Sequence, residues 1–301
     1  MFTSMNIDDK DKIDGIYDLI DKEIHSQDKL YKPDFSQKTG RELLAYYLQS
    51  KFKQVLAFDR NAAVPIFAEV KPDFIQKFSR RLVNNPKKRI LISITGESAS
   101  GKSTICRRIQ EVAIKLNMPV SIFTTDNYFN DISEEIKKYG TFDNLRDNGF
   151  DVDSPNNFQL KLLQEDLERI SNGENVYSPE YLPNGTGISV PNSKLVEAKK
   201  VVVVEGMASM FIDNIDLFDA KIYVETEDDV RKGWFLARAL NERNQDMTNA
   251  KKHWDYIIEA GNKYIKPNRN QADIIINGLS GLDYFTIILE YIYTITNNFH
   301  Q

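Results

Sequence analysis

The spacing of apolar residues divides the chain into two parts. In the first part, apolar side chains recur three and four positions apart, as between Ile13 and Ile20, and this spacing predicts helices. The pattern ends near Pro86, which breaks a helix. We therefore expect residues 1–85 to form a helical N-terminal extension and residues 86–301 to form a domain of a different type.

From Ile90 onward, short continuous apolar runs alternate with longer stretches of helical spacing. The predicted strands are Ile90–Ile94, Val120–Thr124, Val201–Val204, Lys221–Val224 and Ala272–Ile276. The predicted helices are Ser103–Leu116, Phe158–Asn172, Val230–Asn241, Lys251–Tyr264 and Tyr284–Thr296. Apolar strands that alternate with helices indicate an α/β fold with a parallel sheet covered on both faces. Ligands of such sheets bind beyond the C-terminal ends of the strands.

Charge and cysteine content narrow the classes of partner. The 301 residues include 39 Lys and Arg against 44 Asp and Glu, and the net charge is −5. Because no long basic block is present, we expect no nucleic-acid partner. No apolar run approaches the roughly 18 residues of a membrane-spanning helix, so we expect no membrane partner. Cys106 is the only cysteine, which favours a cytoplasmic protein. A homo-oligomer stays open.

A glycine-rich motif directly follows the first predicted strand. It reads Gly96-Glu97-Ser98-Ala99-Ser100-Gly101-Lys102-Ser103-Thr104. The glycines let the backbone turn tightly and aim its N–H groups at a phosphate, while Lys102 reaches the β- and γ-phosphates and the Ser103 hydroxyl can bind Mg²⁺. The following helix points its positive end at the same anion. The motif predicts that the chain binds a nucleoside triphosphate.

Two acidic residues follow predicted strands at the edge of the sheet where ligands bind. Asp126 comes after Val120–Thr124 and could accept a hydroxyl proton or help to hold Mg²⁺. A cap on the next helix explains it equally well. Glu205 comes after the apolar run Val201–Val204, where an unpaired buried charge is unfavourable, and has the form expected of a carboxylate that supports Mg²⁺.

Arginines on the predicted helix Val230–Asn241 and just after it suit contact with phosphate. Arg238 and Arg243 lie five positions apart, and arginine can bind a phosphate with two hydrogen bonds. Solvation at the surface is the alternative for each of them. The polar stretch from Gln245 to Thr248 is typical of a mobile lid, which would exclude water from the reaction.

Together these segments resemble the clade of P-loop kinases that contains phosphoribulokinase, uridine kinase and pantothenate kinase. The similarity runs from about Arg89 to Gly278, roughly two-thirds of the chain. Besides the glycine-rich loop, the matching segments are Thr125–Phe129, Phe150–Phe158, Pro179–Tyr181, Val204–Gly206, Tyr223–Glu225 with Arg238, and Gln271–Ile275. Their order and spacing make the resemblance specific. It implies a three-layer P-loop NTPase-type fold over residues 86–301.

The resemblance also implies an activity, the ATP-dependent phosphorylation of a primary hydroxyl group on a small metabolite, with Mg²⁺. Asp126 is similar to the residue that activates the acceptor, and Lys102, Arg238 and Arg243 are similar to residues around the transferred phosphate. The metal-binding residues that it implies are Ser103, Glu205 and Asp126.

The same resemblance assigns the acceptor site. Asp153 looks like the residue that grips sugar hydroxyls in uridine kinases, Tyr181 occupies the position of a wall tyrosine, and we also expect Tyr128 to bind the substrate. These matches favour uridine or cytidine as the acceptor.

Departures from the uridine kinase pattern keep other acceptors open. Asn184-Gly185-Thr186-Gly187 stands where many uridine kinases have a histidine, and Trp234-Phe235 replaces a pair of arginines, as in pantothenate kinase. Pantothenate or a sugar is therefore an alternative acceptor. A regulatory protein that binds ATP without catalysis is the alternative from another class, although such a protein would not need Asp126.

Overall fold

The computed structural model describes residues 67–74, 76–78, 88–115, 119–182, 185–242 and 245–279, together with a few isolated residues between 53 and 81. Most of the predicted N-terminal helices, the predicted helix Tyr284–Thr296 and Arg243 lie outside this part of the chain. No helix in the described part is long and apolar enough to cross a membrane.

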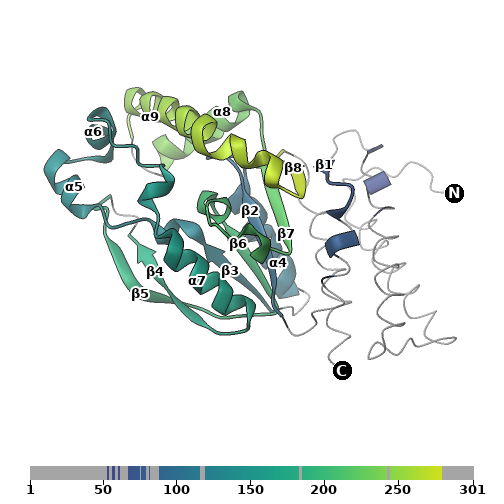
Figure 1. Cartoon of the computed structure of the whole chain (residues 1–301). Helices are drawn as coiled ribbons and strands as arrows, with labels where there is room; N and C mark the ends of the chain where they lie inside the picture. Colours follow the sequence, from purple (N-terminus) through teal and green to yellow (C-terminus); the bar gives the residue numbers. More distant parts are fainter. Residues whose placement is uncertain are drawn as a thin grey trace, which may run out of the picture.

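A six-stranded sheet forms the centre of the molecule (Figure 1). Its strand order is β1-β8-β7-β2-β6-β3. The parallel strands are β2 (Ile90–Thr95), β3 (Val120–Thr124), β6 (Val201–Glu205), β7 (Ala220–Glu225) and β8 (Ile274–Asn277). These five strands were predicted from the sequence, with ends that differ by at most two residues.

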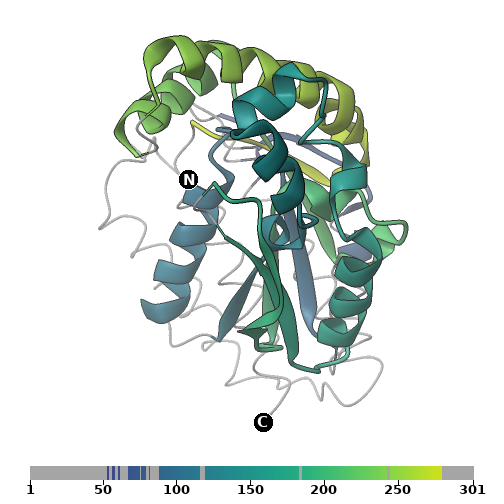
Figure 2. The same ribbon diagram turned by 90° about the vertical axis from the view of Figure 1, so that its left-hand side faces the viewer.

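Helices cover both faces of the sheet and its upper edge. The helices of the described part are α4 (Lys102–Lys115), α5 (Ser133–Tyr139), α6 (Phe142–Asp147), α7 (Leu160–Ser171), α8 (Asp228–Asn241) and α9 (Met247–Ala260). Figure 2 shows α4 on one side of the sheet and α7 on the other, with α8 and α9 across the top. This arrangement confirms the predicted three-layer α/β fold.

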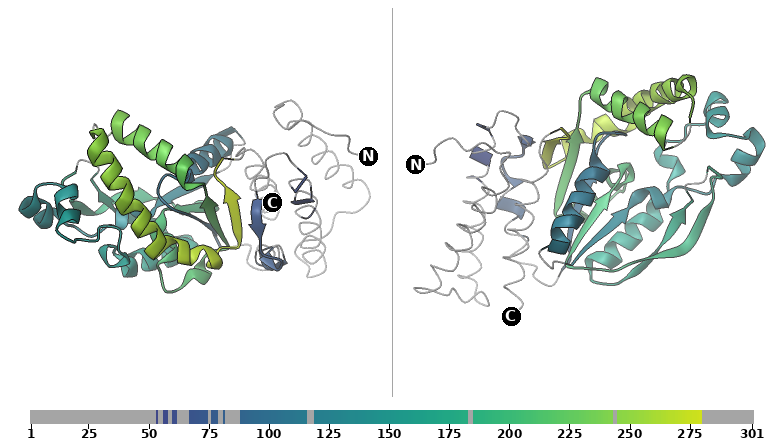
Figure 3. Two further views of the ribbon diagram at one scale, coloured as in Figure 1. Left: turned by 90° about the horizontal axis from the view of Figure 1, so that it is seen from above. Right: turned by 180° about the vertical axis from the view of Figure 1, so that it is seen from behind.

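Short helical turns join several of these elements. The 3₁₀ turns are η1 (Thr125–Tyr128), η2 (Pro155–Asn157), η3 (Met207–Met210), η4 (Ile215–Leu217) and η6 (Lys266–Gln271), and η5 (Gly261–Ile265) is a π-helical turn. Seen from above, α9 crosses over the sheet, and α5 and α6 lie at the end remote from β8 (Figure 3). The C-terminal ends of the strands therefore face a space that α5, α6, α8 and α9 surround.

The core fills the space between the sheet and α7. Leu91 and Val202 from the strands pack with Leu163 and Leu167 from α7, and each of these side chains is fully buried. A second cluster, with Phe235 and Trp254, joins α8 to α9. The two helices above the strand ends are thus fixed to each other by their own apolar contacts.

Two parts of the fold depart from the prediction. Residues Phe67–Val70 form β1, an antiparallel edge strand that pairs with β8, so the prediction of an all-helical segment up to residue 85 is wrong there. Residues Val176–Tyr181 and Ser189–Val196 form a two-stranded hairpin, β4 and β5, which the prediction lacked. Most side chains of β5 are exposed, and a strand without an apolar face gives little periodic signal.

Candidate active site

The glycine-rich loop joins β2 to α4, as predicted, and its backbone is closely packed. Gly96 has φ 143°, and a Cβ atom there would lie 2.4 Å from the carbonyl oxygen of Val224 in β7. Gly101 and Ala99 also have positive φ, 102° and 60°. Successive turns of this kind direct backbone N–H groups into a concave anion-binding site. The loop geometry therefore fits the phosphates of a nucleotide.

Lys102 begins α4 and lies beside the loop. Its Nζ donates a hydrogen bond to the carbonyl oxygen of Glu97 at 2.8 Å. Burial lowers the pKa of the ammonium group, and the nearby charges of Glu205 and Asp126 act in the opposite direction. The ammonium group therefore contacts the loop backbone and lies within electrostatic reach of two carboxylates, a position from which it can interact with a bound phosphate.

Ser103 and Glu205 are brought together, as the predicted metal site requires. The Ser103 hydroxyl donates to Oε1 of Glu205 at 3.1 Å. Glu205 ends β6, the strand between β2 and β3, where it pairs with Ile94 and Thr124. A hydroxyl and a carboxylate at this edge are hard oxygen ligands of the type that Mg²⁺ prefers, so the residues present fit this ion.

Asp126 lies in η1, next to the end of β6. A Cβ atom on Gly206 would lie 2.0 Å from Thr125 Oγ1 and 3.2 Å from Asp126 Oδ1, so the absence of a side chain on Gly206 allows this approach. Asp126 is exposed to solvent as a whole residue. Protein atoms nevertheless surround its carboxyl group, and this desolvation, with the charge of Glu205, raises the pKa of that group to about 6.

The capping interpretation of Asp126 is not supported. The following helix, α5, begins after Ile132, and its first backbone N–H, that of Ser133, donates to Oδ1 of Asp131 at 2.9 Å. Asp131 therefore takes the role that would have explained Asp126. The Asp126 carboxyl faces a cavity instead.

A cavity of about 210 Å³ lies between the strand ends and α9. The residues that line it are Ser98, Asp126, Phe129, Phe142, Arg146, Val152, Asp153, Tyr181, Met207, His253, Ile257, Ala260 and Ile265. It therefore brings together three predicted residues, Asp126, Asp153 and Tyr181, beside the glycine-rich loop. Burial raises the pKa of the Asp153 carboxyl group, and the guanidinium of Arg146 partly offsets this.

Tyr128 does not line this cavity, which corrects its prediction as a substrate-binding residue. Its side chain is fully buried, and its hydroxyl donates to Oδ2 of Asp166 in α7 at 2.7 Å. The next residue, Phe129, lines the cavity instead. The Phe129 ring lies 5.3 Å from the Tyr181 ring and 4.1 Å from that of Phe158, measured between centroids.

The remaining loop residues have different surroundings. Ser98 lines the cavity, and Thr104 is exposed on α4. Ser100 is buried, its carbonyl oxygen accepts from the Thr226 hydroxyl at 2.9 Å, and its own hydroxyl has no hydrogen-bond partner in the described part of the chain.

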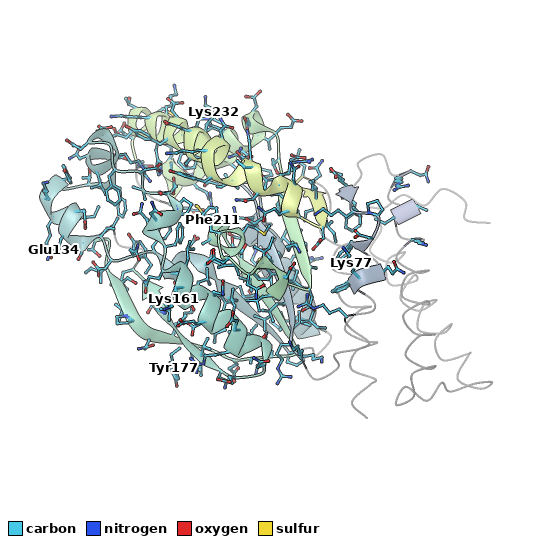
Figure 4. All side chains as sticks on the ribbon, in the orientation of Figure 1. Lys77, Glu134, Lys161, Tyr177, Phe211 and Lys232 are labelled. Carbon is cyan, nitrogen blue, oxygen red and sulfur yellow. The ribbon has the colours of Figure 1, made fainter. Side chains whose placement is uncertain are left out.

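Glu97 ties the loop to the helices above it. Its carboxylate is buried and lies 2.8 Å from Nη1 of Arg231 in α8. Arg231 is fully buried, its Nε donates to the carbonyl oxygen of Ser98 at 3.0 Å, and its guanidinium lies 5.3 Å from the Trp254 ring centroid. Lys232, the next residue, is exposed on the outside of α8 (Figure 4). The Glu97 side chain therefore stabilises the contact between the loop and α8. The part of Glu97 that takes part in the loop itself is its backbone, whose carbonyl oxygen accepts from Lys102.

Of the two predicted lid arginines, one is described. Arg238 lies in α8, is partly buried, and its charge acts on the ammonium group of Lys102. Its predicted role beside the transferred phosphate stays a prediction. Arg243 lies outside the described residues.

Two aspartates connect the opposite walls of the cavity. Asp147, at the end of α6, accepts hydrogen bonds from Lys252 and Tyr256 of α9, each at 2.5 Å. Asp151 accepts from Lys263 at 2.9 Å and from Tyr264 at 2.5 Å, both in η5. We call these four contacts the aspartate clasp. They hold the wall that carries Arg146 and Asp153 against α9 and η5.

Sequence reasoning missed Phe129, Phe142, Arg146, His253 and Ile257 of the cavity. The α6 residues and the α9 residues are more than a hundred positions apart, and nothing in the local pattern indicates that they meet. His253 packs edge-on against Phe235 with ring centroids 5.0 Å apart. Ile257, four positions further along α9, also lines the cavity. The spacing of these two residues, which puts them on one face of a helix, is the signal in the sequence that could have indicated them.

Comparisons with known proteins agree with this geometry. The profile of the Phosphoribulokinase / Uridine kinase family matches residues 91–283. Uridine kinase from Clostridium perfringens (strain ATCC 13124) is 32% identical over 192 residues, which cover 63% of this chain and 88% of that protein. Uridine-cytidine kinase-like 1 of Mus musculus is 29% identical over 199 residues, 65% of this chain and 34% of that protein.

Among solved structures, a kinase from Silicibacter sp. TM1040, provisionally assigned to a fructose transport system, superimposes with a TM-score of 0.51 at 18% identity. The match covers 62% of this chain and 89% of that one. At this identity the likeness concerns the fold alone. The glycine-rich loop, the acids at the strand ends and the extent of the family match together show that the chain belongs to the phosphoribulokinase/uridine kinase family and is an ATP-dependent small-molecule kinase.

Proposed function

We propose that the protein transfers the γ-phosphoryl group of ATP to the primary hydroxyl group of a pyrimidine nucleoside, uridine or cytidine. The observation that carries this proposal is the shared cavity of Asp126 and Asp153, which opens beside Ser98 of the glycine-rich loop. One carboxylate serves the reacting hydroxyl and the other the ribose. The uridine kinase relatives support the same acceptor.

Asp126 orients the hydroxyl group and accepts its proton. A pKa of about 6 leaves the carboxyl group ionised at neutral pH and makes it more basic than an ordinary aspartate, which suits a general base near pH 7. Glu205 and Asp153, both acidic, strengthen its affinity for the proton. An acceptor bound against the Phe129 and Tyr181 rings would displace water from the cavity, and this water would otherwise compete with the acceptor.

Lys102 and Arg238 stabilise negative charge on the transferred phosphoryl group, and Arg243, which lies outside the described residues, is the further candidate from the sequence. Lys102 lies at the start of α4, where the positive end of the helix adds to its charge. Ser103 and Glu205 provide two adjacent oxygens for a cation, with Asp126 as the third candidate. When bound, Mg·ATP would supply the phosphoryl group, and its metal would neutralise charge that develops on the phosphates.

Asp153 binds the vicinal diol of the ribose. An ionised carboxylate accepts two hydrogen bonds from adjacent hydroxyls. These bonds favour the ionised form and so oppose the burial that raises the pKa of the Asp153 carboxyl group. Tyr181 forms the facing wall with Phe129. Loss of the diol would leave the carboxylate unpaired in a dry site, which discriminates strongly against deoxy substrates.

An acceptor screen tests the proposal. Purified protein with Mg·ATP is incubated with uridine, cytidine, 2′-deoxyuridine, pantothenate and simple sugars, and ADP release is measured. We expect turnover of uridine and cytidine, weaker turnover of 2′-deoxyuridine, and none with Lys102→Met. In Asp153→Ala, uridine and 2′-deoxyuridine should react alike. Turnover of pantothenate or a sugar without turnover of either nucleoside would refute the acceptor while leaving the kinase reaction in place.

A further inference from the structure

Arg146 is an enclosed cation with unused hydrogen-bonding capacity. Its side chain is 10% exposed and lines the cavity. In the described part of the chain it forms one ion pair, with Asp143 on the same helix, where Nη1 and Oδ1 are 3.5 Å apart. Among the described residues, none accepts a hydrogen bond from its five N–H groups. None of its nitrogens is among the buried atoms without a partner, so solvent in the cavity reaches these donors. A ligand that displaces this solvent must supply an acceptor in its place, because a donor left without one is unfavourable.

The position of Arg146 along the cavity indicates which part of the acceptor it meets. Asp126 lines the cavity together with Ser98 of the glycine-rich loop, which marks the phosphate end. Asp153 and Arg146 line the same cavity. The charge of Asp153 acts on the Asp126 carboxyl group, and the charge of Arg146 acts on the Asp153 carboxyl group. A nucleoside presents its 5′-hydroxyl, its diol and its base in that same order. In this order, Arg146 is the residue that would contact the base.

The surroundings of Arg146 suit a flat, uncharged ring. Phe142, from the first turn of the same helix, and Val152 line the cavity on this side. The guanidinium already has Asp143 as an ion-pair partner and Asp153 within electrostatic reach. An anionic ligand group would meet Asp153 as well as Arg146. A neutral oxygen acceptor uses the free N–H donors without adding a third negative charge.

We propose that Arg146 donates hydrogen bonds to the 2-carbonyl oxygen of the pyrimidine base. This inference rests on the nucleoside acceptor proposed above and makes Arg146 a specificity-determining residue. Uracil and cytosine share this oxygen and differ at position 4, so a site that recognises it accepts both bases. The neighbouring Asp147, held by Lys252 and Tyr256, fixes the end of the helix that carries Arg146.

Paired variants and base analogues test the assignment. Wild-type protein, Arg146→Met, Arg146→Lys and Asp143→Asn are assayed with uridine, 2-thiouridine and 4-thiouridine at saturating Mg·ATP. Sulfur is a weak hydrogen-bond acceptor, so 2-thiouridine removes the proposed partner and 4-thiouridine is the matched control. Circular dichroism and the Tm of each variant show whether it is folded.

We expect wild type to have a KM for 2-thiouridine about 10- to 100-fold above that for uridine, the range for a hydrogen bond to a charged group. Arg146→Met should raise the KM for uridine by a similar factor and abolish the discrimination, with little change for ATP. Asp143→Asn should retain the discrimination, because it removes only the ion pair. Arg146→Lys should recover it in part.

Other outcomes would overturn the assignment. If Arg146→Met still discriminates between uridine and 2-thiouridine, another group binds the 2-carbonyl. If Asp143→Asn behaves like Arg146→Met, the arginine acts through its ion pair. If wild type turns over pantothenate but no pyrimidine nucleoside, and Arg146→Met loses that turnover, the partner of Arg146 is a carboxylate. That last result would refute the proposed acceptor too, whereas the first two would leave it intact.

Discussion

Ser103 Oγ donates a hydrogen bond to Oε1 of Glu205 at 3.1 Å, which joins the first turn of α4 to the end of β6. The contact places two oxygen atoms of the proposed Mg²⁺ site side by side. We expect Glu205→Gln to raise the Mg²⁺ concentration that gives half-maximal activity by roughly 10- to 100-fold, because an amide binds a hard cation less well than a carboxylate. A Mg²⁺ titration of kinase activity measures this. Glu165→Gln, on the surface of α7, is the matched control, and an unchanged titration in Glu205→Gln would contradict the metal site.

Asp126→Asn is expected to lose activity and gain stability. As a positioned base, Asp126 should contribute about 10²-fold or more to kcat.

The pKa of the Asp126 carboxyl group is higher in the folded protein, about 6, than its ordinary 3.8, so the folded state binds the proton more tightly than the unfolded state. The stability from this difference is present below pH 3.8 and is lost as the pH rises through 6. Wild type should therefore be less stable than Asp126→Asn at pH 7.5.

Urea unfolding of nucleotide-free protein in EDTA, from pH 4 to pH 7.5, measures this difference. Asp131 provides a control of opposite sign. Hydrogen bonds from the Ser133 hydroxyl and from the backbone N–H groups of Ser133 and Ser189 lower the pKa of its carboxyl group, so its contribution is present above pH 3.8 and is lost as the pH falls. Asp131→Asn should destabilise the protein at pH 7.5. Equal pH profiles for the two variants would refute the environment described for Asp126.

Arg231→Met is expected to destabilise the protein by about 3–5 kcal/mol, the usual effect of removing one partner of a buried ion pair. Among the described residues, Glu97, which is 5% exposed, would keep only the more distant cation of Lys266, at 3.7 Å. The double variant Arg231→Met/Glu97→Gln should recover part of the loss, because the uncompensated charge is gone. Urea unfolding of both variants checks this, and a double variant no more stable than the single one would show that the pair does not act through its charges.

Asp151→Asn is expected to weaken acceptor binding selectively. Without its carboxylate, half of the aspartate clasp is lost, and the wall that carries Asp153 is held less firmly against η5. The KM of the acceptor should rise severalfold while the Kd of ADP stays the same, since the glycine-rich loop has no contact with this aspartate. Tyr264→Phe should show a smaller effect in the same direction. Asp213→Asn, on an exposed loop, is the control, and an equal loss of ADP affinity would indicate general unfolding.

The sequence predicts the sheet and the loop well because each depends on a local pattern. The run Val201–Glu205 is buried almost throughout, and a continuous apolar run is what a strand covered on both faces requires. The glycines of the loop are needed where a side chain would collide with β7, as at Gly96. Ser103 and Glu205 meet because parallel strands end at one edge of the sheet.

The acceptor cavity was less predictable for two reasons. Its residues come from segments far apart in the sequence, and the conformation of single helical turns decides which of two adjacent side chains faces the cavity. Tyr128 and Phe129 are adjacent aromatic residues, and only the geometry of η1 decides that the first packs against α7 and the second faces the cavity. Arg146 had no partner in the local sequence apart from Asp143, three positions away, and that spacing is common on exposed helices. The Arg146 side chain is largely buried in a cavity that α9 also lines. The position of α9 depends on tertiary contacts, which the local sequence does not show.

The strand β1 has a consequence for how the kinase domain is isolated. It lies outside residues 91–283, the part that matches the family, yet it pairs along the whole of Ile274–Ile276 in β8. Those three isoleucines are almost fully buried. A truncated protein that begins at residue 88 would leave the N–H and C=O groups of an isoleucine-rich strand unpaired at the edge of the sheet, and such an edge recruits strands from other molecules. Truncation should therefore stop before Phe67, or the catalytic domain will aggregate through β8 although every residue of its active site is present.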